Sequence, residues 1–173
     1  KFDENKVIIH SILPRKSVLS RQSIRSKGEK QLIASNIDFA LIVQSIDRDF
    51  SINRIERYLT ICHEAKIEAK IILSKIDLLG KNEVNDLISK LKSRISNIAI
   101  FSISNTTGQG IEELSTMIQK GKTYCLLGSS GVGKSTLLNS ISGQSLMKTN
   151  EISDHSQRGK HITTHRELKV LEK

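Results

Sequence analysis

A run of residues late in this chain, Gly-Ser-Ser-Gly-Val-Gly-Lys-Ser-Thr over 128–136, constrains the fold more than any other feature. It fits the phosphate-binding pattern GxxxxGK[ST], which requires a strand before the loop and a helix after it. Both are predicted, because an apolar run covers 124–127 and a helical period covers 134–141. The sequence therefore predicts a P-loop, and an α/β fold around it.

Short apolar runs alternate with helical stripes from residue 37 onward. Near-continuous apolar strands are typical of a parallel sheet that is covered on both faces. We therefore expect one α/β domain with a mostly parallel sheet and right-handed crossovers. The predicted strands cover 39–43, 70–73, 98–103 and 123–127, and the predicted helices between them cover 52–62, 84–95 and 111–118.

The residues of the P-loop have separate chemical tasks. Its glycines let backbone N–H groups turn toward a β-phosphate, and the helix that follows adds the positive end of its dipole. Lys134 is expected to reach the β- and γ-phosphates, Ser135 to ligate Mg²⁺, and Thr136 to support the α-phosphate. The predicted phosphate site comprises Gly128, Ser129, Ser130, Gly131, Val132, Gly133, Lys134, Ser135 and Thr136.

A P-loop alone does not distinguish ATP from GTP, but the stretch Ser74, Lys75, Ile76, Asp77 indicates guanine. It follows a predicted buried strand, and α/β sheets bind ligands at the carboxyl ends of their strands. Guanine presents an N1–H and an exocyclic amine side by side, so the Asp77 carboxylate could accept both hydrogen bonds, whereas adenine has no such pair. The methylene stem of Lys75 is expected to lie on the base.

A second loop follows the predicted strand that ends at residue 103. It begins with Ser104 and Asn105 and continues to a Gly-x-Gly at 108–110. In GTPases the corresponding loop turns a backbone N–H toward guanine O6, so we expect this loop to support the base. The alternative is an ordinary loop that caps the helix starting at Ile111.

Basic residues gather near the start of the chain. There are 27 Lys and Arg against 18 Asp and Glu, a formal charge of +9, which favours a polyanionic partner. No aromatic residue lies in the basic cluster, so contact with phosphates and RNA shape is expected rather than stacking on bases. The predicted RNA-binding residues are Arg15, Lys16, Arg21, Arg25 and Lys27.

Cysteines and hydropathy indicate a cytosolic protein. Cys62 lies in a helical stripe and Cys125 in an apolar run, so core packing is expected for both free thiols. No segment resembles a signal peptide or an apolar membrane span. We expect a cytoplasmic monomer.

The order of the motifs, base-reading before phosphate-binding, is the reverse of an ordinary GTPase and resembles circularly permuted GTPases. Further segments resemble the RsgA (YjeQ) family of ribosome-assembly GTPases. They are residues 13–16 with Leu19 and Arg21, residues 34–38, 57–59 and 149–153, and residues 158–161 with Thr163.

The apolar run over 6–13 predicts a strand. The resemblance implies an OB-fold β-barrel whose end and linker are residues 1–33, followed by a circularly permuted P-loop GTPase domain over 34–173. It implies GTP and GDP as ligands with Mg²⁺, the small ribosomal subunit and its rRNA as partners, and ribosome-stimulated GTP hydrolysis late in subunit maturation. A zinc domain would follow the GTPase domain.

The resemblance also implies a first switch loop over 143–165. There Thr163 would contact Mg²⁺ and the γ-phosphate, and His161 beside it is the candidate for orienting or deprotonating the attacking water. Three features depart from the family pattern: Ser74 replaces the usual Asn, Ile162 occupies a position that is usually Thr, and no Asp-x-x-Gly follows the P-loop. We interpret the third as truncation.

Three alternatives stay open on sequence alone. A permuted GTPase acting on the large subunit is disfavoured by the segment Pro14, Arg15, Lys16 after a predicted strand. A small-molecule kinase or ATPase would prefer ATP and would order its motifs differently. A nucleotide-binding RNA module without turnover is compatible with the missing Asp-x-x-Gly.

Overall fold

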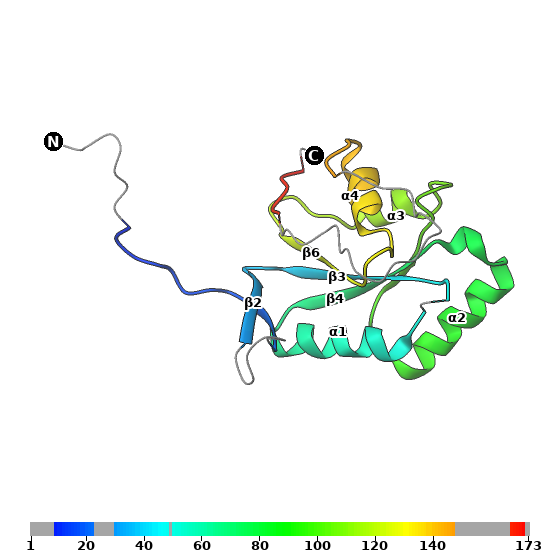
Figure 1. Ribbon diagram of the computed structural model, residues 1–173, viewed down its shortest axis with the longest axis horizontal. Helices are drawn as coiled ribbons and strands as arrows, with labels where there is room; N and C mark the ends of the chain where they lie inside the picture. The colour runs from blue at the N-terminus through cyan, green and yellow to red at the C-terminus, as the bar shows by residue number, and fades with distance from the viewer. Residues whose placement is uncertain (1–8, 23–29, 49, 148–166, 172–173) are drawn as a thin grey trace, which may run out of the picture.

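The computed structural model describes residues 9–22, 30–48, 50–147 and 167–171, and its body is a sheet with helices on both faces (Figure 1). The sheet has four parallel strands in the order β5-β4-β3-β6. The strands are β3 (Phe39–Ser45), β4 (Glu68–Ser74), β5 (Ile100–Ser102) and β6 (Tyr124–Leu127), and the helices are α1 (Ile52–Glu64), α2 (Lys81–Arg94), α3 (Ile111–Thr116) and α4 (Lys134–Ser142).

The predicted parallel α/β architecture is confirmed. Every predicted strand and helix of this sheet is present, and the differences lie at the ends of elements. The largest is at the start of α2, predicted at residue 84 and observed at 81. The strand β5, predicted over 98–103, is observed over 100–102. Its pairing continues one residue further, because Ile103 N donates to Leu73 O at 2.8 Å.

Successive residues of the central strands enter two different cores. Ala40 and Ile42 of β3 and Ile71 of β4 pack with α1 and α2, whereas Leu41 and Val43 of β3 pack with α3 and α4. All five are at most 1% exposed. Since side chains alternate across a strand, a strand covered on both faces must be apolar at nearly every position.

Parallel strands place their following loops along one edge of the sheet. That carboxyl edge carries the loops after β3, β4, β5 and β6, which start at residues 46, 75, 103 and 128. The predicted base-reading, base-supporting and phosphate-binding segments are three of these four loops. The fold alone therefore brings them to one side of the molecule.

A separate antiparallel pair, β1 (Val18–Gln22) and β2 (Lys30–Ser35), precedes the sheet. Leu19 of β1 is fully buried in the same core as α1 and β3. Through Leu19, this pair of strands packs as part of the α/β body. The domain boundary predicted after residue 33 lies within β2. An OB-fold ahead of it stays a prediction.

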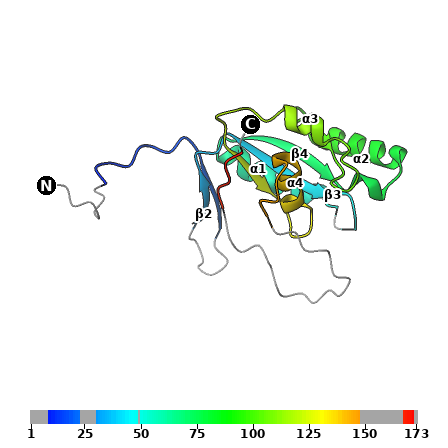
Figure 2. The same cartoon turned by 90° about the horizontal axis from the view of Figure 1, so that it is seen from above.

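The prediction of a strand over residues 6–13 is wrong for residues 9–13, the part that the structure describes. Residues 9–13 form no strand, and residues 6–8 lie outside the described part of the chain. Ile9, Ile12 and Leu13 are 78–83% exposed, on a segment that leads away from the body in both views (Figures 1 and 2). An apolar pattern forms a strand only where a neighbouring strand satisfies its backbone.

Both thiols pack as predicted. Cys62 is buried and Cys125 partly buried, and both are free. Burial raises the pKa of Cys62 to about 11 and that of Cys125 to about 12, so both stay protonated and unreactive near neutral pH. Within the described residues, no helix combines the length and apolar character that a membrane crossing requires.

Candidate nucleotide-binding site

The P-loop connects β6 to α4, as the sequence predicts. Two glycines hold its shape by having no side chain. A Cβ on Gly128 would lie 2.3 Å from Val43 O, and Gly128 has φ 151°. Gly133 caps α4 at φ 92°, in a region that glycine adopts without strain. The loop therefore approaches β3 more closely than any other residue type would allow.

Lys134 folds back over its own loop. Its Nζ donates to Gly128 O at 3.0 Å and to Ser129 O at 2.6 Å. Burial lowers the pKa of the Lys134 ammonium, because desolvation disfavours the charged form. The ammonium thus donates to two carbonyls of the loop. A phosphate would be a stronger acceptor for it, because that hydrogen bond is charge-assisted on both sides.

Ser135 and Thr136 lie in the first turn of α4, and both are partly buried. The Ser135 hydroxyl is a hard oxygen donor of the kind Mg²⁺ takes together with phosphate oxygens and water. Among the described residues, no group of three or more His, Cys, Asp or Glu could hold a metal by itself. Within the described residues, the group predicted to hold a metal at this site is Ser135, together with the phosphates.

The base-reading loop starts with a residue that binds the P-loop. Ser74 is fully buried at the end of β4, and its Oγ donates to Val132 O at 2.7 Å. This bond joins residues that are 58 positions apart in the chain. Ser74, which replaces the family's usual Asn, therefore holds the phosphate loop against the base-reading loop.

The remaining residues of that loop form a short turn. Lys75 adopts the left-handed conformation, φ 62°, and caps a 3₁₀ helix, η1, that covers Ile76–Leu78. Ile76 is buried, whereas Asp77 is exposed. Asp77 thus presents its carboxylate to solvent at the carboxyl edge, as a group that reads guanine must.

The base-supporting loop is shaped by a buried serine. Ser104 Oγ accepts hydrogen bonds from the backbone N–H groups of Thr106 and Thr107 at 3.2 and 3.1 Å. Asn105 points its side chain at the P-loop, with Nδ2 3.5 Å from Gly133 O. Its Oδ1 is buried and has no partner among the described residues. The two predicted base loops and the P-loop therefore form one continuous cluster.

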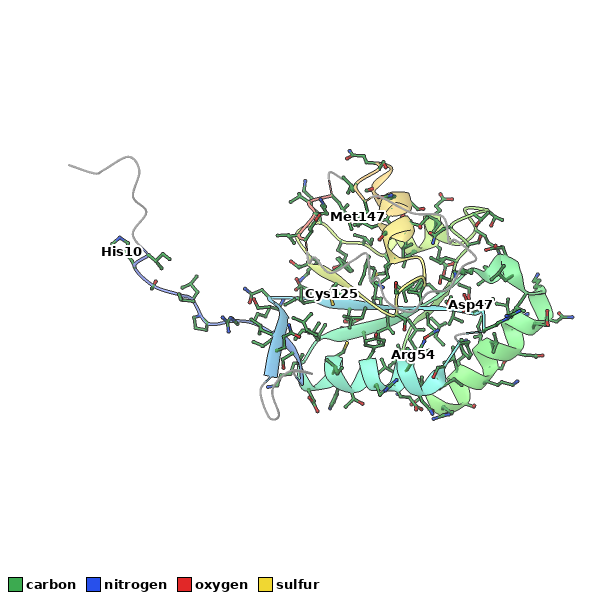
Figure 3. All side chains as sticks on the ribbon, in the orientation of Figure 1. His10, Asp47, Arg54, Cys125 and Met147 are labelled. Carbon is green, nitrogen blue, oxygen red and sulfur yellow. The ribbon has the colours of Figure 1, made fainter. Side chains whose placement is uncertain are left out.

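Two hollows lie between the start of the P-loop and α1. One, of about 190 Å³, reaches from Leu19 to Gly128. The other, of about 310 Å³, is lined by Ser129 and by residues of α1 that include Arg54 and Arg57. Arg54 is labelled on α1 in Figure 3. The sequence analysis assigned neither arginine to the binding site, because the P-loop motif shows nothing of what packs beside it.

The predicted RNA-binding residues are only partly within the described chain. Arg15 is exposed. Lys16 bonds Asp38 through Nζ and donates its backbone N–H to Asn36 Oδ1 at 2.9 Å. Arg21 lies in β1. Arg25, Lys27 and the predicted switch residues His161 and Thr163 lie outside the described residues.

Asp38 accepts several hydrogen bonds at the opposite, amino edge of the sheet. The Lys16 ammonium is its main partner, Thr123 N donates to it at 3.0 Å, and Lys122 lies 3.5 Å away. These contacts, the Lys16 hydrogen bond first, lower the pKa of Asp38 to about 2. Lys16 therefore ties the N-terminal segment to the start of β3 and β6.

Comparison with known proteins identifies the family. The sequence model of the RsgA GTPase family matches residues 12–173. The chain belongs to the RsgA GTPase family. The small ribosomal subunit biogenesis GTPase RsgA 1 of Listeria innocua is 42% identical over 96% of this chain and 47% of its own length. The RsgA protein of Methanosarcina acetivorans is 36% identical over 95% of this chain and 44% of its own length. The chain thus spans about half the length of these RsgA relatives.

Solved structures share the fold. The crystal structure of YjeQ from Thermotoga maritima superimposes with a TM-score of 0.60 at 28% identity, covering 76% of this chain and 44% of that one. YloQ, a circularly permuted GTPase, gives 0.53 at 22% identity, covering 76% and 50%. The predicted permuted P-loop GTPase fold is confirmed for this RsgA-family chain.

Proposed function

We propose that this chain is the nucleotide-binding part of a GTPase that acts in maturation of the small ribosomal subunit. The hydrogen bond from Ser74 to Val132 O carries the proposal, because it joins the base-reading loop directly to the phosphate loop. Asp77 and Lys134 then lie in one cluster, with a guanine-specific acceptor at one end and a phosphate ligand at the other. The names of the RsgA relatives support the assignment to the small subunit.

The chain's own groups account for binding of GTP and GDP. Asp77 accepts from guanine N1–H and the exocyclic amine, and the loop at Ser104 and Asn105 supports the base. Lys134 exchanges the carbonyls of Gly128 and Ser129 for the β- and γ-phosphates. The backbone N–H groups of the P-loop and the start of α4 complete the phosphate cradle.

Hydrolysis requires positioning, charge neutralisation and an oriented water. Water attacks the γ-phosphorus, the bond from that phosphorus to the β–γ bridging oxygen breaks, and GDP, inorganic phosphate and the proton of the water are released. Mg²⁺, held by Ser135 and Thr163, would neutralise charge on the phosphates. We assign His161 to orient the water, and Lys134 to stabilise the negative charge that develops on the GDP leaving group.

The basic surface is proposed to bind rRNA through its phosphates. The net charge of +9 favours such contacts, and we assign them to Arg15, Lys16, Arg21, Arg25 and Lys27. Lys16 is two-thirds exposed even with Asp38 as its partner. The protein would act as a cytoplasmic monomer on the ribosomal subunit.

A change of base specificity tests the guanine assignment. Xanthine carries a carbonyl where guanine has its exocyclic amine, so Asp77→Asn should weaken GDP binding by roughly 100-fold and strengthen xanthosine diphosphate binding. Fluorescent-nucleotide titration measures both affinities. Asp86→Asn on the exposed face of α2 is the matched control. A wild-type preference for ATP over GTP, or an Asp77→Asn protein with unchanged GDP affinity, would contradict the proposal.

The phosphate assignment has its own test. Lys134→Ala should lower GTP and GDP affinity by more than about 100-fold, because a desolvated charge-assisted contact is lost. Lys120→Ala, an exposed change, provides the control. Unchanged affinity of the Lys134→Ala protein would mean that the loop does not bind nucleotide.

A further inference from the structure

An acidic residue that no motif includes lies beside the base-reading loop. Asp47 follows β3, and its Oδ2 lies 2.8 Å from the Nζ of Lys75, which follows the neighbouring strand β4. Both side chains are about a quarter exposed, 26% and 24%. The pair is therefore partly shielded from water, and its position is set by the pairing of β3 with β4.

Asp47 is itself held in place. Its Oδ1 accepts a hydrogen bond from Ser45 Oγ at 2.8 Å, and Ser45 is 1% exposed. Each carboxylate oxygen thus has a different partner, one buried hydroxyl and one ammonium. This arrangement fixes the carboxylate plane, so Asp47 is a rigid acceptor.

Asp47 lies between the two ends of the nucleotide site. β3 is flanked by β4, which carries the base-reading loop, and by β6, which carries the P-loop. Figure 3 shows Asp47 beyond the end of β3, at the carboxyl edge. The Lys75 side chain therefore runs from the base-reading loop toward the end of β3, the strand between β4 and β6.

Lys75 is fixed at both ends. Its backbone is left-handed and caps the 3₁₀ helix that contains Asp77, and its ammonium is bound by Asp47. A free lysine would lose rotamer freedom on packing against a base, and side chains that are ordered in advance avoid that cost. The stem is then ordered before a nucleotide binds, two residues before Asp77 in the chain.

We propose that Asp47 is a positioning residue for the base: it holds the Lys75 ammonium so that the lysine stem forms one wall of the guanine site. The inference rests on the proposed guanine-nucleotide function. Asp47 itself need not touch the nucleotide, since it acts through Lys75. Its acidic side chain, buried hydroxyl partner and place at the end of β3 are the features that suit it to this task.

A double-mutant cycle tests the proposal. Asp47→Ala should weaken GDP binding by roughly 3- to 10-fold, which corresponds to the cost of ordering one long side chain. GTP should weaken by the same factor, because the phosphate end is untouched. In a Lys75→Ala background, Asp47→Ala should have no further effect on affinity, because the group through which it acts is absent.

Glu56→Gln is the matched control, because it breaks an ion pair of the same 2.8 Å length, with Arg94, at an exposed position. It should leave GDP affinity unchanged. Melting temperatures of the nucleotide-free proteins separate a loss of stability from a loss of positioning.

Three results would overturn the proposal. Asp47→Ala could leave affinity unchanged, it could tighten binding, or its effect could persist in full in the Lys75→Ala background, which would indicate a structural role alone. These results are distinct from failure of the proposed function, in which the wild-type protein itself would not bind guanine nucleotides.

Discussion

The phosphate loop and the base-reading loop leave the same edge of one sheet but are held in shape by different means. The P-loop depends on backbone: Gly128 allows contact with Val43 O, and Gly133 starts α4 from a left-handed conformation. The base-reading loop has no glycine. Lys75 adopts its left-handed conformation as a lysine, and bonds made by Ser74 and Lys75 with distant residues support it.

This difference determines what can be learned from sequence. A loop shaped by glycines is visible as a spacing of glycines, because only glycine adopts those angles without strain. A loop shaped by side-chain partners is invisible until the partners meet. Asp47 and Val132, which hold Lys75 and Ser74, are 28 and 58 residues away from them along the chain.

The largest expected effect comes from a methyl group on the phosphate loop. In Gly128→Ala the new Cβ would lie 2.3 Å from Val43 O, so the loop or β3 must move. We expect nucleotide affinity to fall by more than about 100-fold, since a displacement near 1 Å in such a site has effects of this size. Isothermal titration with GDP measures it.

Gly131→Ala sharpens the same comparison. Gly131 is also left-handed, at φ 78°, but a Cβ there would meet nothing within 4 Å. Its expected cost is only the conformational strain of alanine, about 1–2 kcal/mol in the free energy of unfolding. Equal losses of affinity in Gly128→Ala and Gly131→Ala would show that close approach to β3 is not what shapes the loop.

An intermediate effect is expected from the bond between the two loops. Ser74→Ala leaves Val132 O without its donor in a fully buried setting. An unsatisfied buried carbonyl costs about 1–3 kcal/mol, so urea unfolding should give a lower free energy of unfolding by that amount. Ser140→Ala, which removes a bond within α4, should cost less. If both variants were equally stable, the bond between the loops would have no special role.

The smallest effect is expected at the opposite edge of the sheet. The pKa of Asp38 is lowered to about 2 by Lys16, the Thr123 N–H and Lys122, against about 3.9 in an unfolded chain. A lowered pKa stabilises the fold above the unfolded value, and the contribution disappears as pH falls through about 2. Asp38→Asn should therefore be less stable than wild type at pH 7, and the gap should close between about pH 4 and pH 2.

Thermal unfolding across this pH range measures the gap. Asp38→Asn should leave GDP affinity unchanged, because Asp38 lies at the amino edge, away from the nucleotide loops. A change in affinity would mean that the two edges are coupled.

Much of the fold was predictable from patterning. The apolar runs and helical stripes predicted the four parallel strands and their helices. Strands of a sheet that is covered on both faces are apolar at nearly every position, so they stand out as short continuous apolar runs. The strand predicted over residues 6–13 is not formed by residues 9–13, the part of it that the structure describes. Its apolar pattern is as strong, but none of the described strands pairs with residues 9–13.

The candidate site was predictable as far as its motifs extend. Residues 128–136 and the loop at Ser74 to Asp77 were identified by type and spacing, and the fold brings them together at the carboxyl edge. Ser74 was predicted as part of the base-reading stretch, at a position where the family pattern has Asn. The structure shows the bond that its hydroxyl makes with the P-loop.

By itself the sequence determined the class of fold, the phosphate loop and the order of motifs that marks a permuted GTPase, since these depend on local spacing and periodicity. Only the tertiary structure decided which groups hold the loops: the Ser74 hydroxyl on Val132 O, and the Asp47 carboxylate on Lys75. Such contacts join residues that are far apart in the chain, and they exist only once parallel strands have placed their ends side by side.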